Sequence, residues 1–305
     1  MIHCRNLTPN PARPIRPGSE SFFFFWQPRA VCGRFTLRTP AAAWAQEFLP
    51  LWSEEEIAAA ATEYAIAARY NIAPTQSISV IHTEAGASAG SRRQWSLFRW
   101  GLVPPWADDL AIGNRMINAR SETVHEKNSF RKAFVQRRCL IPADGYFEWM
   151  KTPDGKQPYL IERASGGMLA MAGLWEQNKR VSSSGHAIRT CTILTTAANE
   201  TTATIHDRMP VLLEGDQRDA WLDPQQDDPT ALRRLLQPAS NDLLKYAPVS
   251  RLVNRPGNDS PECVQVIDAP QPSPEKPPPK KPSRKPPTKK TPPTAGDGSQ
   301  ATLFD

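Results

Sequence analysis

The chain has 305 residues, of which 39% are hydrophobic and 22% charged, and this length and composition are typical of a soluble globular protein with a sizeable core. The formal net charge is +6, but residues 271–305 hold seven Lys/Arg and three Asp/Glu, so the rest carries only +2. That charge alone does not indicate a nucleic-acid partner.

Cysteine and histidine spacing argues against a metal site. The five cysteines form no Cys-x-x-Cys pair and the five histidines show no ligand spacing, which also makes a disulfide framework improbable. No apolar run is long enough to cross a bilayer. We therefore expect a cytoplasmic protein with no metal, no cofactor and no membrane partner.

The first 31 residues do not look like part of the fold. Residues 1–31 are rich in Pro and Arg and lack helix or strand periodicity. We expect them to be non-native or cleaved, so that the mature protein begins at Cys32. A GTG codon encodes Val but can initiate as Met, so Val31 could mark the true start; self-cleavage of a translated leader is the alternative.

The patterned region covers residues 32–268 and mixes helices with strands. The second expected helix is opened by Ser53, with Glu56 three residues later as a capping box, and Asp216 is the expected N-cap of a later helix. Turn signals at 143–145 and 153–155 separate strands. We expect helices at 40–48, 54–64, 129–137, 217–222 and 229–236, and strands at 77–82, 94–102, 139–141, 146–150, 159–162, 168–175 and 190–196. Strands dominate the middle, so the fold class is α+β. Residues 269–305, rich in Pro and Lys, predict a disordered tail with polyproline II stretches.

Five short motifs could carry chemistry. A cysteine followed by glycine and arginine, as in Cys32-Gly33-Arg34, could be an exposed N-terminal nucleophile with a phosphate clamp beside it, although an internal cysteine is more often a small buried hydrophobe. The other motifs are Trp100-Gly101-Leu102-Val103-Pro104-Pro105-Trp106, Asn118-Ala119-Arg120-Ser121-Glu122-Thr123, Pro142-Ala143-Asp144-Gly145-Tyr146-Phe147-Glu148-Trp149 and His206-Asp207-Arg208-Met209-Pro210.

In their order and spacing these motifs resemble the SRAP family, the SOS response-associated peptidases also known as abasic-site processing proteins. The resemblance spans about Cys32 to Val253. It implies a single α+β domain of curved antiparallel sheet with surrounding helices and a positively charged DNA groove. In that family the catalytic cysteine follows the initiator methionine, whose removal frees the amine and the thiol. The implied partner is single-stranded DNA containing abasic sites, bound by a monomer at the nucleoid or replication fork during the DNA damage (SOS) response.

An N-terminal cysteine suits this chemistry. An abasic site opens to an aldehyde, and an α-amine with a pKa near 8 is neutral more often at pH 7 than a lysine with a pKa of about 10.4. The amine can form a Schiff base, and the neighbouring thiol can then add to the same carbon and close a thiazolidine ring. A peptide-bonded Cys32 would offer only its thiol.

The resemblance assigns roles to further residues. Glu148 would move protons during amine attack and water loss, His206 would act on sugar ring opening and crosslink reversal, and Asn118 would orient the deoxyribose. Without the motifs, an exposed strand carboxylate and a structural histidine would be the simpler interpretations of the first two. The expected DNA-binding residues are Arg34, Arg120, Arg131 and Arg208 on phosphates, and Trp106 and Trp149 on bases or in the core.

The C-terminus resembles a bacterial sliding-clamp binding motif at residues 300–304. Gln300 is followed by Leu303 and Phe304 at the fourth and fifth positions, but the second position departs from the usual Leu. Clamp binding through the tail and a featureless terminus both remain open. For the whole chain, the alternatives to crosslinking are a thiol peptidase or self-processing hydrolase that uses Cys32, and a non-catalytic single-stranded DNA-binding module.

Overall fold

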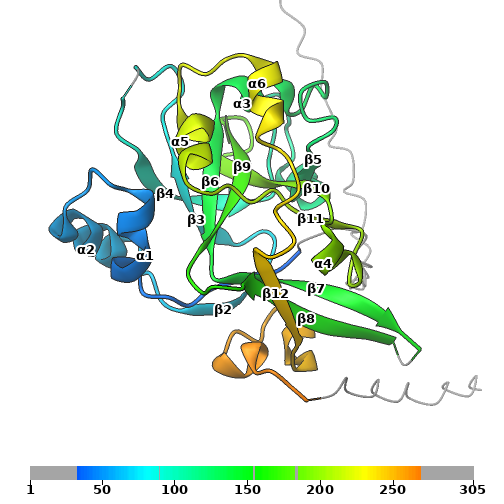
Figure 1. The fold of residues 1–305 in the computed structure, drawn as a ribbon. Helices are drawn as coiled ribbons and strands as arrows, with labels where there is room; N and C mark the ends of the chain where they lie inside the picture. The colour runs from blue at the N-terminus through cyan, green and yellow to red at the C-terminus, as the bar shows by residue number, and fades with distance from the viewer. Residues whose placement is uncertain (1–32, 89, 154, 183–184, 269–305) are drawn as a thin grey trace, which may run out of the picture. The chain divides into compact units, whose positions relative to one another are not determined.

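Two β-sheets organise the chain in the computed structural model, which describes residues 33–268 except 89, 154 and 183–184. The first sheet has the strand order β12-β8-β7-β1-β2, and its β7–β8 pair forms a long hairpin (Figure 1). Every strand pair in this sheet is antiparallel. Its strands are β1 (Phe35–Leu37), β2 (Arg69–Ile72), β7 (Gly145–Thr152), β8 (Gly155–Arg163) and β12 (Leu244–Pro248).

The second sheet closes on itself. Its pairings run β10-β4-β3-β6-β9 and return from β9 to β10, so these strands form a small barrel with a single parallel pair, β4 with β10. Two short strands, β5 and β11, extend it at the end of β10. The strands are β3 (Ser77–His82), β4 (Gln94–Trp100), β5 (Asn118–Arg120), β6 (Arg138–Ala143), β9 (Leu169–Asn178), β10 (Ile188–Ala197) and β11 (Arg208–Pro210).

Short helices surround the sheets. α1 and α2 pack on one another, α5 packs on β6, and α3 packs on β6 and β9 (Figure 1). The helices are α1 (Ala41–Phe48), α2 (Glu54–Glu63), α3 (Arg131–Gln136), α4 (Glu200–Ala203), α5 (Asp216–Leu222) and α6 (Pro229–Arg234), with 3₁₀ turns η1 (Leu110–Arg115), η2 (Arg251–Asn254) and η3 (Pro261–Val264).

The central part of the first sheet is buried on both faces. Side chains of β7 alternate between them: Tyr146 belongs to the main core, whereas Phe147 joins Leu160, Val249, Val253 and Cys263 in a small second core. This second core lies under the C-terminal segment that contains η2 and η3. The C-terminal segment is therefore part of the fold and covers the strand that carries Glu148 and Trp149.

The expected α+β class is confirmed, and most long elements lie where the sequence predicts them. The strand at 77–82 matches β3, and the Ser53–Glu56 capping box is present at α2. The Asp216 N-cap is wrong, because Gly215 occupies that position with φ 49° and Asp216 begins the helix. Three-residue strands such as β1, β5 and β11 were not expected.

The two turn signals differ in outcome. Residues 153–155 connect the paired strands β7 and β8, as expected. The signal at 143–145 instead marks the point where the chain passes from the second sheet to the first. The carboxylate of Asp144 stabilises the chain at this passage between the sheets, because it accepts hydrogen bonds from the backbone N–H groups of Arg38 and Thr39 and from the Thr39 hydroxyl.

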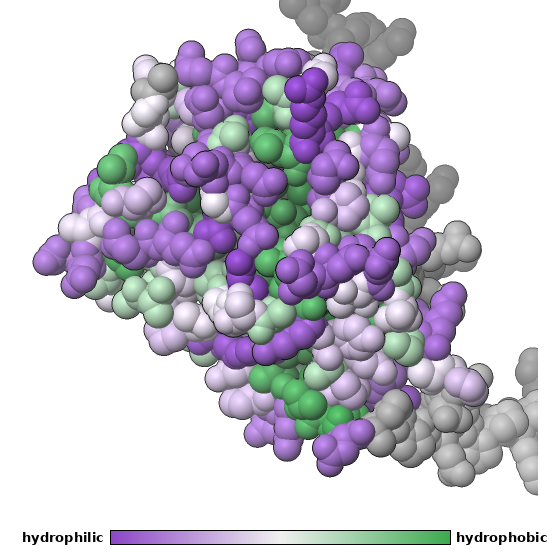
Figure 2. Space-filling model, in the orientation of Figure 1, coloured by the Kyte–Doolittle hydropathy of each residue, from purple (hydrophilic) through white to green (hydrophobic). Residues whose placement is uncertain are grey.

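Hydrophilic side chains prevail on the face drawn in Figure 2, with apolar ones gathered in narrower patches between them. Within the described ranges, no helix has both the length and the apolar character required to span a bilayer. The large apolar side chains exposed in these ranges are Leu51, Leu97, Trp106, Tyr246, Leu252 and Val266.

The barrel interior predicts a sharp cost for added volume at Gly173. A Cβ atom there would lie 2.3 Å from Ile141 Cδ1, 2.9 Å from the Thr192 carbonyl oxygen and 3.0 Å from Cys139 Sγ. We expect Gly173→Ala to lower the free energy of unfolding by about 1–3 kcal/mol, the usual cost of overpacking, as measured by urea denaturation. Gly257→Ala, where the added atom meets nothing within 4 Å, is the control. Equal stability of the two variants would contradict the tight barrel packing.

Candidate functional site

The two motifs around Asn118 and Arg208 meet at the end of β10. Strand β5 runs parallel to β10, with Asn118 opposite Ile193 and Arg120 opposite Thr195. Strand β11 pairs with the same end of β10, with Pro210 opposite Thr195. Two segments nearly 90 residues apart in the sequence, about 118–122 and 206–210, therefore lie on either side of one strand.

Arg208 forms a bidentate ion pair across this cluster. Its two terminal nitrogens each lie 2.9 Å from a Glu122 carboxylate oxygen, and Nη2 also donates to the Thr195 carbonyl at 2.7 Å. The hydrogen bond from Arg208 is the main cause of the lowered pKa of Glu122, and the charge of Arg120 contributes. Arg120 itself is exposed. The cluster therefore presents two guanidinium groups beside one carboxylate.

His206 is half-buried at the entrance to β11. Its Nδ1 accepts the backbone N–H of Arg208 at 3.1 Å and lies 2.8 Å from the Asp207 carboxylate. Burial lowers its pKa, and Lys156, Arg208 and Lys151 lower it further, whereas Asp207 acts in the opposite direction. A histidine with an ordinary pKa of about 6.5 that is lowered in this way is neutral at pH 7. It can therefore accept a proton.

The Trp100–Gly101 motif fixes the start of β5. Gly101 has φ 120°, and a Cβ atom there would lie 2.6 Å from the Gly113 carbonyl oxygen, so the two backbones can touch only through glycine. The indole N–H of Trp100 donates to the Ile117 carbonyl at 2.9 Å. Both contacts position the backbone that leads into Asn118.

Glu148 lies on β7, next to the strand that leads back to the N-terminus. Strand β1 pairs antiparallel with β7, with Phe35 opposite Tyr146, and the Phe147 N–H donates to the Arg34 carbonyl at 3.0 Å. Continuing this register brings Gly33 level with Glu148. The Glu148 side chain is only 3% exposed, so its carboxyl group is held away from bulk water.

The guanidinium of Arg34 is directed into the protein. Its Nη1 donates to Asn71 Oδ1 at 2.9 Å and to the Val253 carbonyl at 2.6 Å, and burial lowers its pKa to about 10. We therefore replace the expected phosphate contact of Arg34 with a structural role: it ties β1 to the C-terminal segment.

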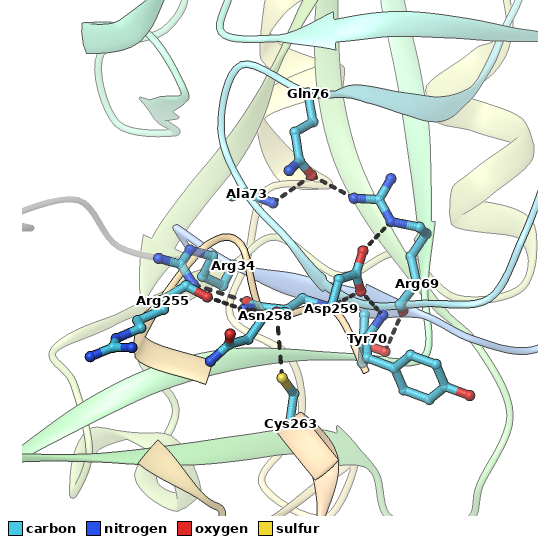
Figure 3. A network of polar contacts seen from close by, with 11 residues as sticks. Arg34, Arg69, Tyr70, Ala73, Gln76, Arg255, Asn258, Asp259 and Cys263 are labelled. Atoms are coloured by element: carbon cyan, nitrogen blue, oxygen red, sulfur yellow. Dashed lines mark hydrogen bonds and ion pairs between the residues drawn. The ribbon is translucent and has the colours of Figure 1, made fainter. Parts of the chain in front are cut away.

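Asn71 and Asp259 complete this connection, part of which Figure 3 shows. Asn71 Nδ2 lies within 3.1 Å of the carbonyl oxygens of Val253, Arg255 and Asn258. The Asp259 carboxylate accepts the backbone N–H groups of Tyr70 and Asn71 at 2.5 and 2.9 Å and pairs with Arg69. The C-terminal segment is thus bonded to β1 and β2 along its length.

The structure places Trp149, Trp106 and Arg131, three of the expected DNA-binding residues, in different surroundings. Trp149 is partly exposed, donates its indole N–H to Asn254 Oδ1 at 2.7 Å, and has the Arg34 guanidinium 5.9 Å from its ring. Trp106 is 54% exposed, and the loop around it is bonded to Asn178 and Arg180 at the end of β9. Arg131 is exposed at the start of α3, which packs on β6 and β9.

Cys32, Gln300, Leu303 and Phe304 lie outside the described residues, so their roles stay predictions. In the described ranges, no group of His, Cys, Asp and Glu side chains could hold a metal ion. Sequence reasoning missed Glu122, although it lies within the Asn118 motif, because its partner Arg208 is distant in sequence. It also missed Lys151 and Lys156, which the hairpin turn at 153–155 places opposite one another.

The family comparison agrees with this geometry. A model described as "SOS response associated peptidase (SRAP)" matches residues 31–256. The chain belongs to the SRAP family. It is 43% identical over 236 residues to "Abasic site processing protein YoqW" of Bacillus subtilis, which covers 77% of this chain and 99% of that protein. It is 33% identical over 229 residues to "Abasic site processing protein HMCES" of Gallus gallus, covering 65% of this chain and 66% of the relative.

A solved structure supports the SRAP fold. A protein from Bacteroides thetaiotaomicron superposes with a TM-score of 0.65 at 24% identity and covers 77% of this chain and 100% of its own. At that identity the match shows the fold alone. The expected single α+β SRAP-like domain is confirmed.

The Asp259 connection predicts a pH-dependent stability. Burial acts to raise the pKa of Asp259, but hydrogen bonds from Arg69, Tyr70 and Asn71 outweigh it and leave the pKa below its usual value. A carboxyl group with a lowered folded pKa stabilises the fold above its unfolded pKa of about 3.9, and this contribution is lost as the pH falls through the folded value. We expect Asp259→Asn to be less stable than the unsubstituted protein at pH 7, and the difference to shrink below about pH 4.

Urea unfolding of both proteins between pH 7 and pH 3 measures this difference. Asp242→Asn makes the same charge change at an exposed position and should leave the free energy of unfolding nearly unchanged. A difference between Asp259→Asn and the unsubstituted protein that stays constant over the whole pH range would show that the carboxylate charge does not hold the C-terminal segment.

Proposed function

We propose that the mature chain, beginning at Cys32, crosslinks itself to abasic sites in single-stranded DNA through a thiazolidine and so shields the lesion in the DNA damage response. The observation that carries the proposal is the register of β1 on β7. Extended by two residues toward the N-terminus, this register brings Gly33 level with Glu148, whose carboxyl group is buried. Cys32 is bonded to Gly33, so their Cα atoms are about 3.8 Å apart whichever way the chain turns. We assign the amine and the thiol of Cys32 to a reaction that Glu148 assists.

The bond changes follow from the aldehyde. The neutral Cys32 amine attacks the aldehyde carbon, and the resulting carbinolamine loses water to give a Schiff base. The thiol sulfur then adds to the C=N carbon while its proton passes to nitrogen, which closes the five-membered ring without an oxidant or reductant. Glu148 would carry protons between nitrogen and the departing hydroxyl, and neutral His206 would assist ring opening of the sugar.

Arg120 and Arg208 are suited to binding the phosphates next to the lesion. Guanidinium groups match phosphate oxygens, and these contacts supply affinity without sequence preference. Asn118 begins the strand that ends at Arg120, so the sugar-orienting and phosphate-binding groups come from a single three-residue strand. The exposed indole of Trp106 and the partly exposed indole of Trp149 would be available for base stacking.

The names of the relatives support this function. YoqW and HMCES are both called abasic site processing proteins, and the match to YoqW covers almost its whole length. The description of the family model also contains the word peptidase, which favours a second candidate: a thiol hydrolase that uses Cys32 to remove its own leader. The intact mass of the native protein distinguishes a leader that is made and cut from one that is never translated.

The thiol has a separate role from the amine. We expect Cys32→Ala with a free N-terminus to give a labile adduct that borohydride traps, but no heat-stable crosslink, because the Schiff base needs only nitrogen and the ring needs sulfur. Denaturing gels with an abasic oligonucleotide measure both species. A stable adduct equal to that of the unsubstituted protein would refute the thiazolidine. The chain that retains residues 1–31 should be inert.

Glu148 and Arg120 should affect different steps. We expect Glu148→Gln to slow crosslinking by roughly 10²–10⁴-fold at saturating DNA, the range for a lost general acid or base, with little change in Kd. Arg120→Ala should raise Kd and reduce the log–log salt slope by about 0.7, the value for one single-strand phosphate contact. Single-turnover rates and equilibrium binding at several salt concentrations separate the two. Equal losses of affinity in both variants would contradict this division.

A further inference from the structure

The β7–β8 hairpin places two lysines directly opposite one another. Lys151 pairs with Lys156 in the antiparallel register, and both are exposed. Like charges at directly opposed positions of a sheet are destabilising. In the part of the chain that the structure describes, neither lysine forms an ion pair. By contrast, Lys245 of β12 lies opposite Glu162 in the same sheet. Among the described residues of the hairpin, this positive pair has no partner of opposite charge.

An aromatic side chain lies on the same face of the hairpin. Side chains alternate along a strand, so Phe147, Trp149 and Lys151 are directed to one face of β7. Phe147 is packed in the small second core, which identifies that face, and Trp149 lies partly exposed between the core and the lysine. An indole followed by a pair of cations is the combination that single-strand binders use for bases and phosphates.

The two lysines also act electrostatically on a residue of the candidate site. Their charges act on His206 together with that of Arg208. The two hairpin lysines and Arg208 therefore all act on one histidine of the candidate site. Glu148 lies on the same strand three residues before Lys151, so its side chain is directed to the other face of β7, whereas the lysines lie beyond Trp149 on the face of the second core.

We propose that Lys151 and Lys156 bind the phosphodiester backbone of the DNA strand on one side of the abasic site, with Trp149 beside them on the same face of the hairpin. This inference rests on the proposed function. It assigns the hairpin to the flanking nucleotides, whereas Arg120 and Arg208 bind next to the lesion. The ligand is a single-stranded nucleic acid backbone, so sequence preference is not expected from these contacts.

The test compares two double variants that remove the same charge. Lys151→Ala/Lys156→Ala should weaken binding to a single-stranded oligonucleotide and reduce the log–log salt slope by about 1.4, which corresponds to two phosphate contacts at about 0.7 each. The control, Lys179→Ala/Lys245→Ala, removes two exposed lysines at separate places and should leave the slope within about 0.3 of the unsubstituted protein. Equal slopes for all three proteins would overturn the inference.

Oligonucleotide arms locate the contact. The same proteins are assayed with abasic oligonucleotides that extend only to the 5′ side or only to the 3′ side of the lesion. The Lys151→Ala/Lys156→Ala variant should bind one of these two oligonucleotides more weakly than the unsubstituted protein does, and should bind the other with the same affinity. A loss of affinity for both oligonucleotides would contradict a contact on one side of the lesion. Displacement of the bound oligonucleotide by an acidic peptide in preference to competitor DNA would contradict a contact with the nucleic acid backbone.

Failure of the inference and failure of the proposed function are distinguishable. If the unsubstituted protein binds single strands but forms no heat-stable adduct, the proposed crosslinking fails while the salt slopes still test the hairpin. If it forms the adduct and the hairpin variant has an unchanged slope, only the hairpin inference fails. Circular dichroism and thermal unfolding of the variants exclude misfolding, because removal of two like charges that face one another should not lower stability.

Discussion

A buried amide, that of Asn71, joins the two ends of the domain, and the position of the N-terminal strand depends on it. Asn71 is fully buried, accepts a hydrogen bond from Arg34, and donates to carbonyl groups of the C-terminal segment. Arg34 and Val253, which also bond directly, are 219 residues apart in the sequence. Buried polar groups of this kind are costly when unpaired, so the network stabilises the fold only as a complete set.

This network matters for the proposed function because it joins the strand that follows Cys32 to the segment that contacts Trp149. Arg34 is two residues from Cys32, and the C-terminal segment that it binds also accepts the Trp149 indole N–H through Asn254. The N-terminal strand, the aromatic side chain and the segment that covers them are therefore held as one unit. A reaction that needs both the amine and the thiol of one residue to reach a single carbon benefits from such a fixed entry point.

Sequence patterns predicted the long elements and the motifs, but not the contacts between distant segments. The strand at 77–82 was recognisable from its apolar run, and the α2 capping box from the spacing of Ser53 and Glu56. Strands β1, β5 and β11 have three residues each, too few to show a period, and they are strands only because β7 and β10 pair with them. Those short strands carry or flank most of the candidate site.

The role of Arg34 shows the same limit at the level of one side chain. A surface phosphate clamp and a buried structural arginine have the same signature in the sequence Cys-Gly-Arg-Phe. Only the placement of Asn71 and Val253 decides between them. The motifs made no prediction of burial for Glu148 or Arg120, and the structure shows that Glu148 is buried and Arg120 is exposed.

The Arg208–Glu122 pair sets a condition on how DNA binds. Because both nitrogens of the Arg208 fork already contact one carboxylate, a phosphate that approaches Arg208 must share the guanidinium or displace Glu122. Displacement leaves a carboxylate next to a phosphate, and that repulsion reduces the net gain. Among the described residues Arg120 forms no ion pair and faces solvent, although its charge also acts on Glu122. Under the proposed function, Glu122 therefore makes Arg208 a group that orients the site more than it attracts the strand, and the attraction is assigned to Arg120 and to the lysines of the hairpin.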